Sequence, residues 1–125
     1  MNIPSFDPKK NYLVYILDIL EAIDRIQEYC QGVDEILFSQ DLKLRDAVIR
    51  RFQIIGEAAA KVPEVIRLKY PQIPWKKVVA QRNLIIHDYA TVRYTEIWRV
   101  ITEDLPNLKP HLDQVKADLE QGIKP

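Results

Sequence analysis

The sequence predicts an all-α protein folded as a single up-and-down bundle of five to six helices. Apolar residues recur at intervals of three and four along most of the chain, the spacing of one helix face. No segment shows the strict alternation of apolar and polar residues that predicts a β-strand. The 125 residues contain no internal repeat or change in composition, so we expect one domain spanning residues 1–125. Helices joined by short loops are typical of an up-and-down bundle.

The first helix is expected near the N-terminus. Asp7 and Pro8 resemble a helix cap followed by a proline in the first turn, and an apolar stripe follows them. We therefore predict a helix from about Pro8 to Gln31. Gly32 is then placed to adopt the left-handed conformation that ends a helix.

A second long helix is expected after a linker over residues 32–38. Ser39 is predicted to cap this helix, which should end at Pro63. Gly56 lies inside it, together with alanines at positions 58–60. Because these side chains are small, they make a thin patch where another helix can approach closely.

Prolines mark the remaining helices. We expect a short helix from Pro63 to Tyr70, a fourth that starts at Pro74, a fifth that stops near Leu105-Pro106, and a sixth after it. The apolar pattern of the fourth helix breaks after Tyr89.

Charge and composition exclude several classes of protein. Eighteen basic and eighteen acidic residues give zero formal charge, which counts against a module that only binds nucleic acid but leaves room for a local basic groove. Cys30 is the single cysteine, so no internal disulfide can form, and it is expected to be a buried structural thiol. No leader-like N-terminus or long apolar run is present, so we expect a cytoplasmic protein without a membrane span.

Metal and cofactor chemistry lack their usual signals. His87 and His111 are the only histidines, they lie 24 residues apart, and no zinc-binding motif surrounds either of them. Neither a phosphate-binding glycine loop nor a G-x-S-x-G nucleophile motif occurs. We therefore expect no metal and no bound cofactor.

A polar cluster interrupts the fourth helix instead. Arg82 follows Trp75 by seven residues and so falls on the face expected to be buried, where a guanidinium needs a partner. Glu57 of the second helix is a candidate counter-ion. The other members of the cluster follow within one or two turns: Asn83, His87, Asp88 and Tyr89.

Helix geometry leaves several arrangements of this cluster open. Asn83 and His87 are four residues apart and share a face, whereas Arg82 and His87 are separated by about 140° around an ideal helix. The long arginine could bridge that angle, the helix could unwind near Ile86, or two copies of the chain could combine their residues. A structural interpretation also remains, with Arg82 a paired core cation, His87 a helix-end histidine and Tyr89 a packing aromatic.

Several motifs together resemble a known family. Gly56-Glu57-Ala58, Ile73-Pro74-Trp75, the run from Arg82 to Tyr89, Ile97-Trp98 and Asp104-Leu105-Pro106 are similar to the HepT-type (DUF86) branch of the HEPN superfamily. The resemblance extends from the first helix to about Leu112. It implies a helical bundle that forms a homodimer, with the R-x4-H motifs of both copies facing a shared cleft. It also implies a metal-independent endoribonuclease.

The resemblance assigns roles to the matching residues. It implies that His87 takes the proton of a ribose 2′-hydroxyl, that Arg82 binds the scissile phosphate and that Asn83 orients one of them. It also implies that the chain is the toxin of a type VII toxin–antitoxin system and cuts tRNA or mRNA. Its partner would be a minimal nucleotidyltransferase antitoxin of the MntA type, which uses ATP to attach AMP to Tyr89.

Two other functions remain open on the sequence alone. The chain could be a non-catalytic helical partner or a nucleotide-binding subunit of a nucleotidyltransferase, and the zero net charge is the best support for this alternative. It could also be a structural dimer without a ligand. In that case Arg82 should have a fixed carboxylate partner.

Overall fold

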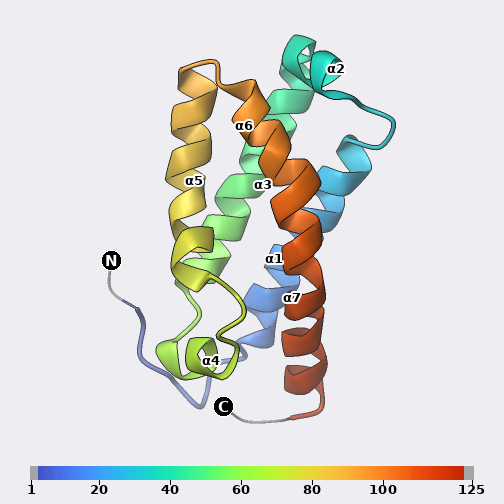
Figure 1. Ribbon diagram of the computed structural model, residues 1–125. Helices are drawn as coiled ribbons and strands as arrows, with labels where there is room; N and C mark the ends of the chain where they lie inside the picture. Colours follow the sequence, from blue (N-terminus) through green and yellow to red (C-terminus); the bar gives the residue numbers. More distant parts are fainter. Residues whose placement is uncertain (1–2, 123–125) are drawn as a thin grey trace.

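The computed structural model describes residues 3–122 and contains only helices within them (Figure 1). The all-α prediction is therefore confirmed. Within this range no helix is both long and apolar enough to cross a membrane. The elements are α1 (Leu13–Tyr29), α2 (Glu35–Gln40), α3 (Leu42–Ala60), α4 (Glu64–Lys69), α5 (Trp75–Ala90), α6 (Tyr94–Arg99), the π-helical segment η1 (Val100–Asp104) and α7 (Leu105–Glu120).

Four long rods alternate in direction, as predicted for an up-and-down bundle. These rods are α1, α3, α5 and the continuous run from α6 through η1 to α7 (Figure 1). The short helices α2 and α4 lie at opposite ends of the bundle (Figure 1). Helix α3 is central, because it packs against both α1 and α5, while α7 packs against α1.

The core follows the apolar stripe of each rod. In α1 the residues Ile16, Ile19, Ile23 and Ile26 are completely buried, at the three- and four-residue spacing of one helix face. Each such side chain contributes about 1.5–3 kcal/mol of hydrophobic free energy when it leaves water. Cys30 packs against the edge of this core but is only half-buried, so the predicted burial of its thiol is partial. Burial nevertheless raises the pKa of its thiol to about 11.

Helix α1 begins at Leu13, later than the predicted start near Pro8. The segment before it forms a turn, in which the Asp7 carboxylate accepts a hydrogen bond from the backbone N–H of Lys9 at 2.9 Å. Asp7 therefore stabilises this turn and does not cap the helix. At the other end Gly32 has a φ of +73°, which confirms its left-handed conformation.

The predicted linker over residues 32–38 contains most of α2. Asp34 caps this helix through its carboxylate. Ser39 is not a helix cap, because it lies in the last turn of α2 and its hydroxyl donates to a carbonyl three residues earlier. The cap of α3 is Asp41, whose carboxylate accepts from the backbone N–H of Leu44 at 3.0 Å.

The predicted break between a fifth and a sixth helix is wrong. The backbone N–H of Leu105 donates to the carbonyl of Val100, five residues earlier, so one turn is widened and the rod continues. Pro106 lies at the start of α7, in the widened region, where its missing N–H is tolerated. With α6, η1 and α7 counted as one rod, the described part of the chain forms six helical bodies. The predicted number holds because one helix was missed and another was divided.

A hydrogen bond joins the loop before α5 to the last rod. The buried Tyr70 hydroxyl donates to the Asp118 carboxylate at 2.6 Å. Burial, followed by this bond and the negative charge of Asp118, raises the pKa of Tyr70 to about 12. The folded state therefore holds the phenolic proton more tightly than the unfolded chain does.

We expect Tyr70→Phe to lower the free energy of unfolding at pH 7 by about 1 kcal/mol, the net value of one hydrogen bond. Because the pKa of Tyr70 is higher in the folded than in the unfolded protein, the protonated phenol stabilises the fold. This contribution to the free energy of unfolding is fully present below pH 10 and is lost as the pH rises from about 10 to 12. The difference between wild type and Tyr70→Phe should therefore shrink over this window. Urea unfolding followed by circular dichroism measures both effects. A constant difference up to pH 12 would contradict the prediction.

Candidate functional site

Helix α5 carries Arg82, Asn83, His87 and Tyr89 of the predicted site, and Glu57 lies on α3. Helix α5 is an uninterrupted α-helix from Trp75 to Ala90. Unwinding near Ile86, one of the arrangements left open by the sequence, is therefore wrong. Arg82 and His87 keep the wide angular separation of an ideal helix. Their side chains leave α5 in different directions.

Arg82 lies where α5 and α3 approach most closely. A Cβ atom placed on Gly56 of α3 would lie 2.8 Å from the Cβ of Arg82, so the predicted close approach at Gly56 is confirmed. Arg82 is half-buried by this contact. Within residues 3–122 Arg82 forms no ion pair. Glu57, its expected counter-ion, is exposed and is therefore not paired with Arg82 in this range. The interpretation of Arg82 as a paired core cation is therefore wrong, and its charge is available for a ligand.

His87 and Asn83 lie on the solvent-facing side of α5. The His87 side chain is 65% exposed, and its Nδ1 lies 3.7 Å from Oδ1 of Asp88. Asn83, one turn earlier, is also exposed. This matches the same-face pair that the spacing predicts. The Asp88 carboxylate also lies 3.9 Å from Nε of Arg93, which places a second cation near the histidine.

Tyr89 faces α3. Its hydroxyl donates to Oδ1 of Asp46 at 2.8 Å, and its ring makes an edge contact with Tyr94 at a centroid distance of 5.8 Å. Burial, followed by the hydrogen bond to Asp46, raises the pKa of Tyr89. The phenol is therefore protonated at neutral pH, and its proton already points at a carboxylate.

Arg45 packs its guanidinium against the rings of Tyr89 and Tyr94 and was not among the predicted site residues. Its guanidinium lies 4.4 Å from the ring centroid of Tyr94, and it donates to the carbonyl of Ser39 at 2.6 Å. A signal was present in the sequence, because Arg45 falls on the same apolar face of α3 as Val48 and Phe52. Asp46 gave no such signal, since its partner is 43 residues away.

A groove of about 420 Å³ runs between α3 and α5 beside Tyr89. Asp46, Arg50 and Gln53 line it from α3, and Ile86 and Tyr89 line it from α5. The groove therefore brings an acceptor carboxylate and a cation next to the tyrosine hydroxyl.

Helix α5 ends in a strained turn. Val92 has a φ of +61°, in the left-handed region where glycine normally follows a helix. The N–H groups of Val92 and Arg93 donate to the carbonyls of Tyr89 and Asp88, which is the hydrogen-bond pattern of a Schellman motif. A β-branched residue in this conformation costs about 1–2 kcal/mol. The strained turn directly follows the predicted site.

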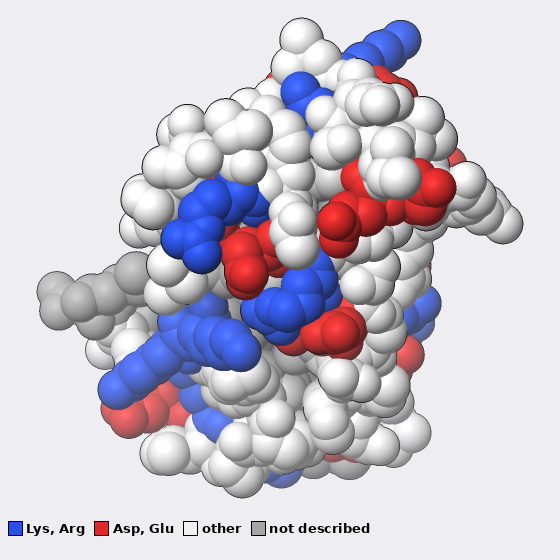
Figure 2. Space-filling model, turned by 45° about the horizontal axis from the view of Figure 1, so that its top comes forward, with Lys and Arg blue, Asp and Glu red and all other residues white. Residues whose placement is uncertain are grey.

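The surface at the end of the bundle where α5 stops carries charged side chains of both signs. Figure 2 shows basic and acidic side chains interleaved on this face, in agreement with the zero net charge. Within residues 3–122 no group of three or more histidine, cysteine or acidic side chains is arranged to hold a metal ion.

The fold and the motif together define a class. It is an all-α bundle in which one long helix presents an arginine that has no ion-pair partner within residues 3–122, followed five residues later by an exposed histidine. The comparison with known families gives the same answer. The ribonuclease HepT-like family matches residues 19–115. The chain belongs to this family.

Two relatives support the assignment. A putative RNase of Methanocaldococcus jannaschii is 35% identical over 107 residues, which cover 86% of this chain and 98% of the relative. A probable ribonuclease HepT of Thermococcus cleftensis is 34% identical over 108 residues, with 86% and 98% covered. No solved structure matches the chain.

Proposed function

We propose that the chain is a metal-independent endoribonuclease that acts as a homodimer. The observation that carries this proposal is the pair formed by Arg82, which has no ion-pair partner in the described chain, and His87, whose side chain is largely exposed. Family membership and the printed names of the relatives support an RNA substrate. The separation of the two side chains on one straight helix favours a site that combines residues of two copies.

In the proposed reaction His87 of one copy takes the proton of a ribose 2′-hydroxyl. The oxygen attacks the adjacent phosphorus, and the bond to the 5′-oxygen breaks as a solvent water donates a proton to it. Arg82 binds the phosphate and stabilises the added negative charge of the transition state. The products carry a 2′,3′-cyclic phosphate and a 5′-hydroxyl. Asn83 would orient the histidine or the phosphate.

Cleavage of tRNA and mRNA by the purified protein in EDTA tests this function. We expect His87→Ala to reduce the rate by about 10²–10⁴-fold, the usual contribution of a general acid–base group. Mapping of the product ends should show the cyclic phosphate. If wild type and His87→Ala leave the same RNA intact in EDTA, the catalytic proposal is wrong. An Arg25→Ala variant is the control, because Arg25 is an exposed residue of α1 away from the motif.

We further propose that the chain is a toxin silenced by a minimal nucleotidyltransferase antitoxin that attaches AMP to Tyr89. The Tyr89 oxygen would attack the α-phosphorus of ATP and release pyrophosphate, while Asp46, which already accepts the hydroxyl hydrogen bond, would take the proton. The added nucleotide brings negative charge and bulk beside the site. Intact mass after co-expression with the antitoxin should rise in steps of AMP. Tyr89→Phe should remain unmodified.

A second candidate is a non-catalytic helical partner or nucleotide-binding subunit of a nucleotidyltransferase. The groove beside Tyr89, with Arg50 on its wall, favours it, because this groove has a cation for a phosphate without requiring catalysis. Growth assays separate the two candidates. Expression without the antitoxin should be toxic and relieved by Arg82→Ala or His87→Ala if the chain is a ribonuclease, and harmless if it is only a partner.

A further inference from the structure

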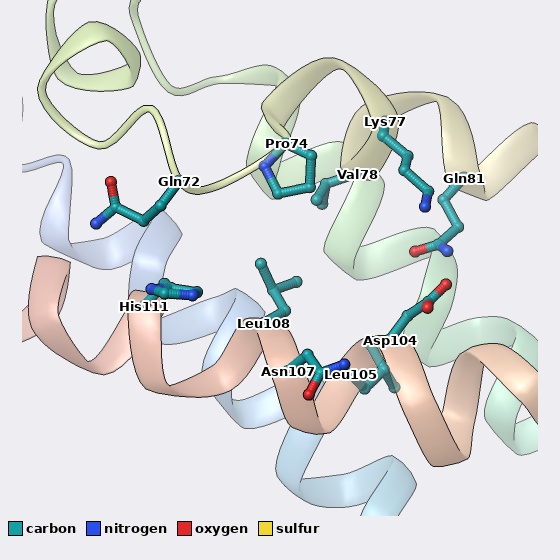
Figure 3. A pocket seen from close by; sticks show the side chains of 10 residues that line it. All are labelled: Gln72, Pro74, Lys77, Val78, Gln81, Asp104, Leu105, Asn107, Leu108 and His111. Carbon is teal, nitrogen blue, oxygen red and sulfur yellow. The ribbon is translucent and has the colours of Figure 1, made fainter.

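A second cavity lies beside the first half of α5 and shares no lining residue with the groove beside Tyr89. It has a volume of about 220 Å³ and is lined by α5, by α7, by the loop before α5 and by Asp104 at the end of η1. Helix α5 packs closely against α3 and α6 but not against α7, which leaves this space open. Figure 3 shows its residues, none of which has a role in the proposed ribonuclease reaction.

The walls and the end of this cavity differ in chemistry. Pro74 and Val78 face Leu105 and Leu108, which makes two apolar walls suited to a flat ring. At one end Gln81 and Asp104 point toward one another from the facing helices (Figure 3). The cavity therefore joins an apolar slot to a polar end.

Both polar groups at this end lack partners within the described chain. Gln81 is only 8% exposed, and its amide makes no hydrogen bond to any residue between positions 3 and 122. The Oδ2 atom of Asp104 is buried and accepts no hydrogen bond, although Oδ1 accepts one from Arg99 at 3.0 Å. A buried carboxylate oxygen without a hydrogen bond is costly, so a ligand that donates to Oδ2 of Asp104 is favoured. Because nothing holds the Gln81 amide, it can turn to admit a ligand to Oδ2.

We propose that this cavity binds a guanine base. A carboxylate only accepts hydrogen bonds, and guanine alone among the four RNA bases offers two adjacent donors, N1–H and N2–H, on its pairing edge. These would meet Asp104, and the Gln81 amide would donate to O6 of the base. Adenine and uracil offer a single donor position on this edge, and cytosine places acceptors beside its donor. Lys77, also on the cavity wall, supplies a cation for the attached phosphate.

Binding of mononucleotides tests the proposal without any cleavage. Calorimetric titration with GMP, IMP, AMP, CMP and UMP at one salt concentration should show GMP binding at least about tenfold more tightly than AMP, CMP or UMP, since a bidentate pair discriminates by about 1–3 kcal/mol. IMP, which lacks the N2 amino group, should bind more weakly than GMP. Equal affinities for all five nucleotides, or no binding at millimolar concentration, would overturn the proposal.

Two variants and a matched control locate the site. Asp104→Asn and Gln81→Leu should each lower GMP affinity about tenfold or more. Glu103→Gln is the control, because Glu103 is a neighbouring carboxylate that also pairs with Arg99, at 3.8 Å, but lies outside the cavity. Circular dichroism checks that each variant is folded. Unchanged GMP binding by both folded cavity variants, or an equal loss in Glu103→Gln, would place binding elsewhere and refute the site.

The guanine could belong to an RNA chain or to a free nucleotide, and RNA cleavage maps distinguish these sources. If it belongs to the RNA, cleavage positions should show a fixed guanine in wild type and lose it in Gln81→Leu. If a free nucleotide is the ligand, the map should not change although GMP binding is lost. The binding result does not depend on the ribonuclease proposal, because His87→Ala should bind GMP as wild type does.

Discussion

Mixing the Arg82→Ala and His87→Ala variants should restore RNA cleavage that neither variant shows alone. If each site combines Arg82 of one copy with His87 of the other, a mixed dimer contains one complete site and one site that lacks both groups. Random exchange makes about half of the dimers mixed, so the restored activity should approach about a quarter of wild type. Each variant by itself should be reduced by about 10²-fold or more.

The structural reason is the straightness of α5. Because the helix has no interruption between Arg82 and His87, the two side chains leave it about 140° apart. Arg82 is held against Gly56 of α3, whereas His87 lies on the solvent-facing side. A phosphate bound by one chain's Arg82 is then better reached by a histidine from a second chain.

A matched mixture controls for effects other than sharing of the site. His87→Ala mixed with the double variant Arg82→Ala/His87→Ala should not recover activity, because no dimer in that mixture contains His87. Native mass spectrometry measures the fraction of mixed dimers. Mixed dimers that form in the expected proportion but cleave no faster than the single variants would show that the site does not combine residues in this way.

The sequence predicted the long rods because their cores follow a helical period. Ile16, Ile19, Ile23 and Ile26 repeat over three turns, and a pattern of that length has no competing interpretation. Helix α2 was missed because six residues show less than two turns. Only Phe38 among them is buried, and several of its apolar neighbours are exposed.

The helix ends were predicted wrongly where a residue type occurs in more than one local structure. Asp7 and Ser39 both have side chains that cap helices, yet each forms a local bond to a different backbone group. Pro106 wrongly indicated the end of a helix. The widened turn that accommodates it depends on a backbone hydrogen bond from Leu105 to Val100, which residue types do not predict. In each case the competing bond is equally local, so tertiary packing decides between them.

The site was predictable along one helix and not across helices. The spacing placed Asn83 and His87 on one face, and the small residues around Gly56 indicated a close helix approach. The hydrogen bond from Tyr89 to Asp46 joins two helices, as does the cavity that contains Gln81 and Asp104. Such pairs depend on the rotation of one rod against another, which a sequence pattern does not specify.

Gly56→Ala should destabilise the protein and slow RNA cleavage although every proposed catalytic residue remains. Alanine favours a helix over glycine by about 1 kcal/mol, but the added Cβ would lie 2.8 Å from the Cβ of Arg82. Because both atoms are attached directly to the backbone, the two helices must separate, and overpacking of this kind costs about 1–3 kcal/mol. The position of Arg82 then changes, and a displacement of about 1 Å can cost up to about 10²-fold in rate.

The sign of the effect should reverse when the opposing Cβ is removed. In an Arg82→Gly background the alanine at position 56 no longer meets a Cβ on α5, so Gly56→Ala should raise the free energy of unfolding by up to about 1 kcal/mol. Urea unfolding of the four variants in this cycle measures the coupling. A loss of stability of the same size in both backgrounds would mean that the cost of Gly56→Ala arises from another contact, such as the Val79 carbonyl at 3.5 Å, and that Arg82 is not positioned by Gly56.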